Sequence, residues 1–175
     1  KKEKNLIAII GVIMLSSCTK SNVEIYKSST PKIDVKQFFN GKVKAWGIVQ
    51  NWSGDVVNKF DVTMEGTWNG DVGKLEEDFV YYNGKIQKRI WTLTKISDNE
   101  IEGKAGDIVG VATGKTSGDT LNFHYVMDID VDGKTHRVKL DDWMWAMNDG
   151  VIINRSYIKK FGITVAELTI FMQKQ

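Results

Sequence analysis

Arginine, tryptophan and asparagine stand at spacings that would let them hold a small molecule from neighbouring strands. Arg89 and Trp91 are two residues apart, so both side chains lie on the same face of an extended segment. Asn154 and Arg155 are adjacent near the end of the chain, and Trp46 lies near its beginning. A guanidinium can bind the polar head of a ligand, while an indole ring packs against its apolar part. These residues therefore predict recognition of an apolar or amphipathic molecule.

Two consecutive acids, Asp141 and Asp142, point to opposite faces of a strand, which argues against a catalytic pair of carboxylates. If the apolar face of that strand is inward, Asp142 lies inside and needs a partner such as Arg89 or Arg155. Two interpretations remain open: a buried structural ion pair, or a group that faces the ligand. Trp143 shares the face of Asp141 and would either line the interior or form an outward patch for a partner.

The sequence contains no recognisable catalytic constellation. Neither His124 nor His136 has a nucleophile at a known spacing, and there is no Gly-x-Ser-x-Gly motif or glycine-rich phosphate loop. The single cysteine excludes an internal disulfide and a thiolate metal cluster. The acids of residues 128–132 alternate along one segment but lack the loop and closing glutamate of a calcium site. We therefore expect no catalytic residue, no metal and no cofactor.

The charge of the chain excludes another class of function. The formal net charge is +2 and comes entirely from the first four residues, so the rest of the chain is neutral. A protein that binds nucleic acid through counterion release needs an excess of lysine and arginine, and we expect no nucleic-acid partner. A hydrophobic content of 42% excludes intrinsic disorder, and a length of 175 residues favours one domain, which we expect to be monomeric.

The first residues are typical of a bacterial export signal. Lysines within residues 1–4 precede an uncharged apolar run over residues 5–15, which is shorter than the roughly 20 residues that a membrane-spanning helix needs. The sequence Leu15-Ser16-Ser17-Cys18 resembles the lipobox of bacterial lipoproteins, in which the cysteine receives a diacylglyceryl group and the leader is cleaved before it. The alternative is a secreted protein whose only cysteine falls there by chance.

The lipobox interpretation predicts a signal peptide at residues 1–17, a polar tether at residues 18–30 and a folded domain at residues 31–175. Thr19 stands where an aspartate would resemble an inner-membrane retention signal. By analogy with enterobacterial sorting, we expect the protein on the periplasmic face of the outer membrane. Acyl chains bind a bilayer at about 0.8 kcal/mol per buried CH₂, so a lipid anchor on Cys18 would make the membrane a partner.

Turn dipeptides divide the domain into long segments of alternating polarity. Pairs such as Asn69-Gly70 and Asn83-Gly84 accept the positive φ values of hairpin turns, and such pairs recur roughly every fifteen residues. Between them apolar and polar side chains alternate, as over residues 56–68 and 119–131. We expect eight or nine antiparallel strands, at residues 42–52, 56–68, 73–82, 85–97, 100–115, 119–131, 134–147, 151–157 and 163–172.

Long strands joined by short turns leave exposed edges unless the sheet closes on itself. We therefore predict an all-β fold, a single antiparallel up-and-down barrel, with a short helix or turn at residues 34–39. Four glycines within residues 100–115 suit the sharp bends of one strand in a closing barrel. A two-sheet sandwich is the alternative, although its strands are usually shorter.

Seven short motifs follow one another along the domain. They are Ala45-Trp46-Gly47, Gly66-Thr67-Trp68, Arg89-Ile90-Trp91, Asp107-Ile108-Val109-Gly110, Asp141-Asp142-Trp143-Met144, Ile153-Asn154-Arg155 and Lys160-Phe161-Gly162. In this order they resemble the uncharacterised proteobacterial lipoprotein family known as domain of unknown function 3833, over residues 39–171. The resemblance implies a lipocalin-like domain without an assigned activity and favours a lipid as the ligand. In lipocalin-like barrels a late arginine packs across an early tryptophan at the base, which implies a structural cation-π contact between Arg155 and Trp46 here. The alternative is that these two residues face the ligand.

The leading hypothesis is an outer-membrane-anchored, lipocalin-like barrel that binds a small apolar or amphipathic ligand such as a lipid or fatty acid. The residues expected to bind it are Trp46, Arg89, Trp91, Asp142, Trp143, Asn154 and Arg155. The alternative is a ligand-free module that acts in the cell envelope through its surface, because a barrel of about eight strands can also be filled by its own side chains.

Overall fold

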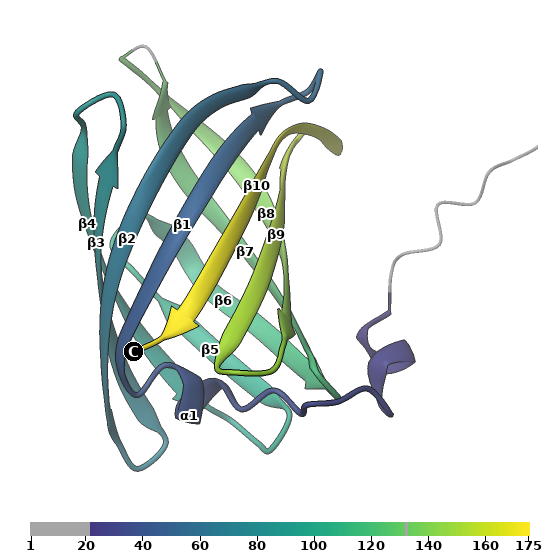
Figure 1. Ribbon diagram of the computed structural model, residues 1–175. Coiled ribbons are helices and arrows are strands. Elements are labelled where there is room, and N and C mark those ends of the chain that lie inside the picture. Colours follow the sequence, from purple (N-terminus) through teal and green to yellow (C-terminus); the bar gives the residue numbers. More distant parts are fainter. Residues whose placement is uncertain (1–21, 132) are drawn as a thin grey trace, which may run out of the picture.

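The computed structural model describes residues 22–131 and 133–175, which form a closed antiparallel barrel (Figure 1). Consecutive strands pair with one another all the way around it. Two short helical segments precede them, the 3₁₀ turn η1 (Val23–Tyr26) and the helix α1 (Val35–Phe38). The strands are β1 (Gly41–Asn51), β2 (Val56–Asn69), β3 (Val72–Tyr81), β4 (Ile86–Lys95), β5 (Glu100–Lys104), β6 (Ile108–Ser117), β7 (Thr120–Val131), β8 (Lys134–Ala146), β9 (Val151–Lys160) and β10 (Ile163–Lys174).

Pairing between the first and last strands closes the sheet. β1 runs antiparallel to β10 from the pair Val43 and Lys174 to the pair Asn51 and Ala166, and its other edge pairs with β2. Neither edge of β1 is therefore left for another chain to pair with. The predicted class, an antiparallel up-and-down barrel made from consecutive hairpins, is confirmed.

The barrel has ten strands, and the prediction of eight or nine was wrong. The segment expected to be one strand at residues 100–115 is divided by a turn at residues 105–107 into β5 and β6. Gly106 lies in this turn, and the Ile108 N–H donates to the Ala105 carbonyl at 3.2 Å. The adjacent Gly106 and Asp107 are turn-forming residues, so this glycine ends a strand where we expected it to bend one.

The short hairpin of β5 and β6 leaves half of β4 without a second neighbour. β5 pairs with β4 only over Thr92–Lys95, while Ile86–Trp91 pairs with β3 alone. The turn at residues 105–107 consequently lies beside the middle of β4. This position brings Asp107 to the side chain of Arg89.

The N-terminal segment crosses the base of the barrel, the end at which β1 begins and β10 ends (Figure 1). Asp34 caps α1 by accepting a hydrogen bond from the Gln37 N–H at 2.8 Å, and the Trp68 indole donates to the Phe39 carbonyl at 3.2 Å. A Cβ at Gly66 would collide with that same carbonyl, so glycine is needed for this close approach. The short helix or turn predicted at residues 34–39 is confirmed, and it covers the base.

Residues 22–30 pack against the barrel, whereas the sequence analysis assigned them to a polar tether. Val23 is buried, Glu24 forms an ion pair with Lys115 at 2.8 Å, and the ring of Tyr26 lies 6.3 Å from the ring of Trp143. The predicted signal peptide, Cys18 and the beginning of the tether lie outside the described residues. In the part of the chain that is described, no helix has the length and apolar character to cross a membrane.

The side chains that face inward form one main core. It is continuous around the barrel, and its largest members include Phe39, Phe60, Phe79, Trp91 and Phe123. The described residues form a closed barrel with its own hydrophobic clusters. They therefore have the closed sheet and the core that an independently folding domain needs.

Candidate functional site

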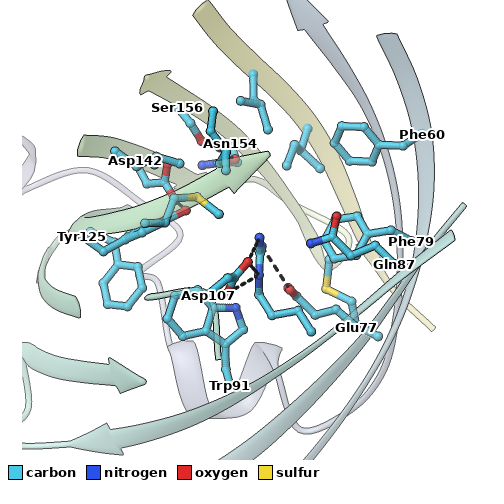
Figure 2. Close-up of a pocket in the computed structure, with 18 of the residues that line it drawn as sticks. Phe60, Glu77, Phe79, Gln87, Trp91, Asp107, Tyr125, Asp142, Asn154 and Ser156 are labelled. Carbon is cyan, nitrogen blue, oxygen red and sulfur yellow. Dashed lines mark hydrogen bonds and ion pairs between the residues drawn. The ribbon is translucent and has the colours of Figure 1, made fainter. Parts of the chain in front are cut away.

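The barrel holds a cavity of about 630 Å³, within the size range of sites for small organic ligands (Figure 2). At the end opposite α1, exposed residues beside the β3–β4 and β7–β8 turns line it, among them Lys85, Ile86 and Val131. The cavity therefore opens to solvent at that end. Its apolar wall includes Phe60, Leu75, Phe79, Trp91, Phe123, Met144, Leu168 and Ile170.

Arg89 lines the cavity from β4 and is held by two acids, Asp107 and Glu77, which Figure 2 labels. Its Nε and Nη2 donate to Asp107 Oδ2 at 2.9 and 2.7 Å, and its Nη1 lies 3.7 Å from Glu77 Oε2. Glu77 is the partner of Arg89 in the register of β3 and β4, whereas Asp107 comes from the β5–β6 turn. The guanidinium carbon also lies 5.5 Å from the centre of the Phe79 ring and 6.0 Å from that of Trp91. Two carboxylates and two aromatic rings thus fix the guanidinium in place.

Glu77 is buried in the cavity wall and is only 9% exposed. Burial raises the pKa of its carboxyl from 4.5 to about 7, against the opposing effect of the positive charge of Arg89. Near neutral pH the carboxyl is therefore divided between its protonated and ionised forms. It can donate a hydrogen bond in the first form and accept one in both.

A second polar pair, Asp142 on β8 and Tyr125 on β7, lines the same cavity (Figure 2). The Tyr125 hydroxyl donates to Asp142 Oδ2 at 2.9 Å. Burial raises the pKa of Asp142 to about 6, and the Tyr125 hydroxyl and the charge of Arg89 oppose that rise. Asp142 is therefore mostly ionised at neutral pH.

Two buried carboxylate oxygens in the cavity wall accept no hydrogen bond from the protein. They are Glu77 Oε2 and Asp142 Oδ1, and no other buried side-chain polar atom in residues 22–131 and 133–175 is in this state. The neighbouring side chains on β9 are paired elsewhere, because the Asn154 amide donates to the Trp143 carbonyl at 3.0 Å and the Ser156 hydroxyl donates to Asn154 Oδ1 at 3.2 Å. Buried polar atoms normally have a hydrogen-bond partner, so these two oxygens mark the cavity as a place where a bound group could donate.

Four of the seven residues predicted to bind a ligand line this cavity. They are Arg89, Trp91, Asp142 and Asn154. Asp142 lies inside the barrel, as predicted if the apolar face of its strand is inward. Its hydrogen-bond partner is Tyr125 and not Arg89 or Arg155. The role of these four residues in binding stays a prediction.

The expected contact between Arg155 and Trp46 was wrong, because both side chains lie on the outer surface. Trp46 is 39% exposed, and its ring lies 5.9 Å from that of Phe171. Arg155 points away from the cavity that its neighbour Asn154 lines, and it forms an ion pair with Glu167. Side chains alternate along a strand, so neither residue can reach the interior in this register.

Trp143 also lies on the outer surface, so its predicted place in the cavity was wrong. It is nevertheless only 5% exposed, because Tyr26 of η1 packs on it and its ring stacks with Trp145 at a centroid distance of 6.3 Å. The segment that contains Tyr26 was predicted to be a polar tether, so no side chain was expected to pack over an outward-facing tryptophan. Trp143 holds the N-terminal segment against the barrel.

Glu77, Asp107 and Tyr125 were not among the residues predicted to bind a ligand, although all three line the cavity. Glu77 stands between Leu75 and Phe79 on the inward face of β3, and an acid between two apolar residues of one face was a usable signal. Asp107 lies in a turn, so no periodicity pointed to it. Among the residues that the structure describes, no three His, Cys, Asp or Glu side chains gather as metal ligands would.

The described residues form a closed, antiparallel, ten-stranded barrel with an internal cavity, which is compatible with a lipocalin-like fold. The chain belongs to the family described as a protein of unknown function, DUF3833, whose model matches residues 12–174. The family predicted from the seven motifs is therefore confirmed.

The fold is similar to that of a solved structure, the S-type phycobiliprotein lyase CPES from Guillardia theta. The TM-score is 0.57, the sequence identity is 12%, and the match covers 89% of this chain and 99% of that chain. At this level of identity the likeness shows the fold alone. Among curated proteins, none matches the sequence.

Proposed function

We propose that the barrel binds one small amphipathic molecule with a hydrocarbon chain. The observation that carries this proposal is the cavity of about 630 Å³, which combines an apolar and aromatic wall with a few buried polar groups. Ligand sites in proteins typically have this composition, since the apolar wall provides affinity and the polar groups fix orientation. A barrel packed solid by its own side chains, as a purely structural module would be, lacks such a volume.

We propose that the cavity binds its ligand without catalysing a reaction. The charged groups of the cavity are engaged with each other, Arg89 with Asp107 and Glu77, and Asp142 with Tyr125. An activated nucleophile needs an adjacent general base, and the described lining holds no histidine or cysteine, while the Ser156 hydroxyl donates to an amide oxygen, Asn154 Oδ1. Membership of a family without an assigned activity gives no support for an enzyme.

Binding of a homologous series of alkan-1-ols tests this proposal. We expect calorimetric titration of residues 22–175 to show one site, with affinity rising as methylene groups are added, because each buried CH₂ contributes about 0.8 kcal/mol. The rise should stop when the chain no longer fits the cavity. No detectable heat of binding across the series, at protein concentrations sufficient for millimolar affinity, would contradict the proposal.

The surface of the barrel favours a second candidate function, a module that binds a partner. The turns opposite α1 carry aromatic side chains that are highly exposed, Trp52 at 84%, Tyr82 at 64% and Phe161 at 93%. Exposed aromatic groups of this kind occur at protein and membrane contacts. This candidate gains support if the alcohols do not bind.

We propose further that the protein is a lipoprotein anchored through Cys18 on the periplasmic face of the outer membrane. The basic start, the short apolar run and the sequence Leu15-Ser16-Ser17-Cys18 support it, as does Thr19 in place of an aspartate. Residues 22–30 already pack on the barrel. Only the few residues between Cys18 and residue 22 would therefore separate the acyl chains from the folded domain.

Replacing Cys18 with serine should abolish processing and anchoring. The thiol is the acceptor of the diacylglyceryl group, so Cys18→Ser is expected to leave an uncleaved precursor or a protein displaced from the outer membrane. Membrane fractionation with metabolic labelling by a radioactive fatty acid measures both effects. As a control, Ser17→Ala keeps a small residue before the cysteine and should be labelled and sorted normally. Normal labelling and outer-membrane fractionation of Cys18→Ser would refute the anchor.

A further inference from the structure

We infer that the polar group of the ligand is a hydrogen-bond donor without negative charge, such as an ammonium or a hydroxyl, and that Asp142 accepts from it while Glu77 adds to the negative charge of the cavity. This inference rests on the proposed function, which it extends from an amphipathic molecule to a chemical class of head group. The sequence predicted a lipid or a fatty acid whose polar head faces an arginine. The geometry of the cavity points instead to a head group that donates to a carboxylate.

The first support is the state of two buried carboxylate oxygens: Asp142 Oδ1 has no hydrogen-bond partner among the described residues, and Glu77 Oε2 has only the charge of Arg89 Nη1 at 3.7 Å. Asp142 is 5% exposed and Glu77 is 9% exposed, both line the cavity, and each keeps one carboxylate oxygen that accepts no hydrogen bond from the protein. Leaving a buried acceptor unpaired is costly, so such atoms are rare in native structures. A bound ammonium or hydroxyl would supply a donor to Asp142 Oδ1, whereas the ionised carboxylate of a fatty acid has no donor to offer.

The second support is the balance of charge within the cavity. Three carboxyl groups, those of Glu77, Asp107 and Asp142, face a single guanidinium, that of Arg89. At the open end Lys85 lines the cavity together with Asp128 and Asp130, so these residues do not reverse the balance. The interior is therefore neutral to negative, and the low effective dielectric of a buried site strengthens its repulsion of an anion.

The third support is the state of the arginine itself. Asp107 occupies its Nε and Nη2, and Glu77 lies 3.7 Å from its Nη1. A fatty-acid carboxylate that binds the remaining N–H groups of Arg89 would lie beside these two acids. Like charges at close range in a buried site repel one another strongly.

Three ligands with the same alkyl chain test the inference: dodecylamine, dodecanol and dodecanoate, titrated calorimetrically into residues 22–175 at pH 8. We expect the amine and the alcohol each to bind at least tenfold more tightly than dodecanoate. Dodecanoate binding as tightly as the other two, or more tightly, would overturn the inference and leave the proposed function intact. If none of the three binds, the proposed function fails and the inference fails with it.

Two substitutions assign the preference to particular residues. In Asp142→Asn the preference for dodecylamine over dodecanoate should fall at least fivefold, because the ionised acceptor is lost. The matched control is Asp141→Asn, since Asp141 is the adjacent acid on the outer face, paired with Lys159 at 2.8 Å, and its loss should leave the preference unchanged. Glu77→Gln provides an independent variant if Asp142→Asn does not fold. A wild-type preference in a folded Asp142→Asn or Glu77→Gln chain would contradict the assignment.

Discussion

Replacing Arg89 with methionine is expected to lower the free energy of unfolding by about 3 to 5 kcal/mol at pH 8, the cost of breaking a buried ion pair by removing one partner. Methionine keeps much of the length and apolar volume of arginine, so the loss of stability measures the effect of removing the charge. The substitution leaves a buried and a half-buried acid without a partner, because Glu77 loses the only guanidinium within 4 Å that the described residues provide and Asp107 loses a bidentate partner. Urea denaturation monitored by circular dichroism measures the change.

The pH dependence of that loss identifies its cause. The pKa of Glu77 in the folded protein is about 7, above its ordinary 4.5, so the folded state binds this proton more tightly and stability falls as pH rises from about 5 to 8. Arg89 moderates that fall. Arg89→Met should therefore be less destabilising at pH 5, where the carboxyl is protonated, than at pH 8.

The control for this prediction is Arg137→Met. Arg137 also forms a bidentate pair, with Asp128 at 2.8 and 2.9 Å, but the arginine side chain is 62% exposed. An exposed pair contributes about 0 to 1 kcal/mol, so this variant should lose little stability at either pH. Equal losses in the two variants would contradict the buried charge network as the cause.

Filling the cavity is expected to abolish binding while the barrel stays folded. Leu168 lines the cavity from β10 and is partly buried, and Leu168→Trp would place an indole ring in the space that the alkyl chain needs. We expect the affinity for dodecanol to fall at least tenfold in calorimetric titration. The cavity offers room for the larger ring, so the cost in stability should stay within about 1 to 3 kcal/mol, the range of overpacked cores.

Thr169→Trp adds the same ring to the opposite face of the same strand and serves as the control. Its neighbours Leu168 and Ile170 both line the cavity, so Thr169 points outward. This variant should bind dodecanol like the wild-type chain. Retained affinity in a folded Leu168→Trp chain would place the alcohol somewhere other than the cavity.

The fold was largely predictable because its signals are local. Asn-Gly and Asp-Gly pairs mark hairpin turns, and alternation marks strands, so nine expected segments match the observed strands closely except at residues 100–115. There the turn at residues 105–107 contains Gly106, and a glycine within an alternating segment is compatible with a bend, a bulge or a turn. The choice among bend, bulge and turn depends on the pairing of β5 with only part of β4, which is not visible in the sequence.

The site was harder to predict because it depends on strand parity and on a turn. Assigning Trp46 and Arg155 to the interior required knowing which face of each strand is inward, and an amphipathic residue such as tryptophan is tolerated on both faces. Arg89 and Asp142 were placed inside, but their partners come from elements distant in sequence. Asp107 reaches Arg89 only because the β5–β6 hairpin is short, and Tyr125 meets Asp142 through the register of β7 and β8.

The position of a bound alkyl chain tests the central claim most directly. Isotope-filtered NOE spectroscopy of residues 22–175 with dodecanol measures which side-chain protons lie within about 5 Å of the chain. We predict cross-peaks from the methylene protons to the rings of Trp91 and Phe123, which line the cavity, and none to the exposed rings of Trp52 and Phe161. Cross-peaks to Trp52 and Phe161 alone, or none to any ring of the barrel interior at saturating dodecanol, would contradict a ligand-binding cavity.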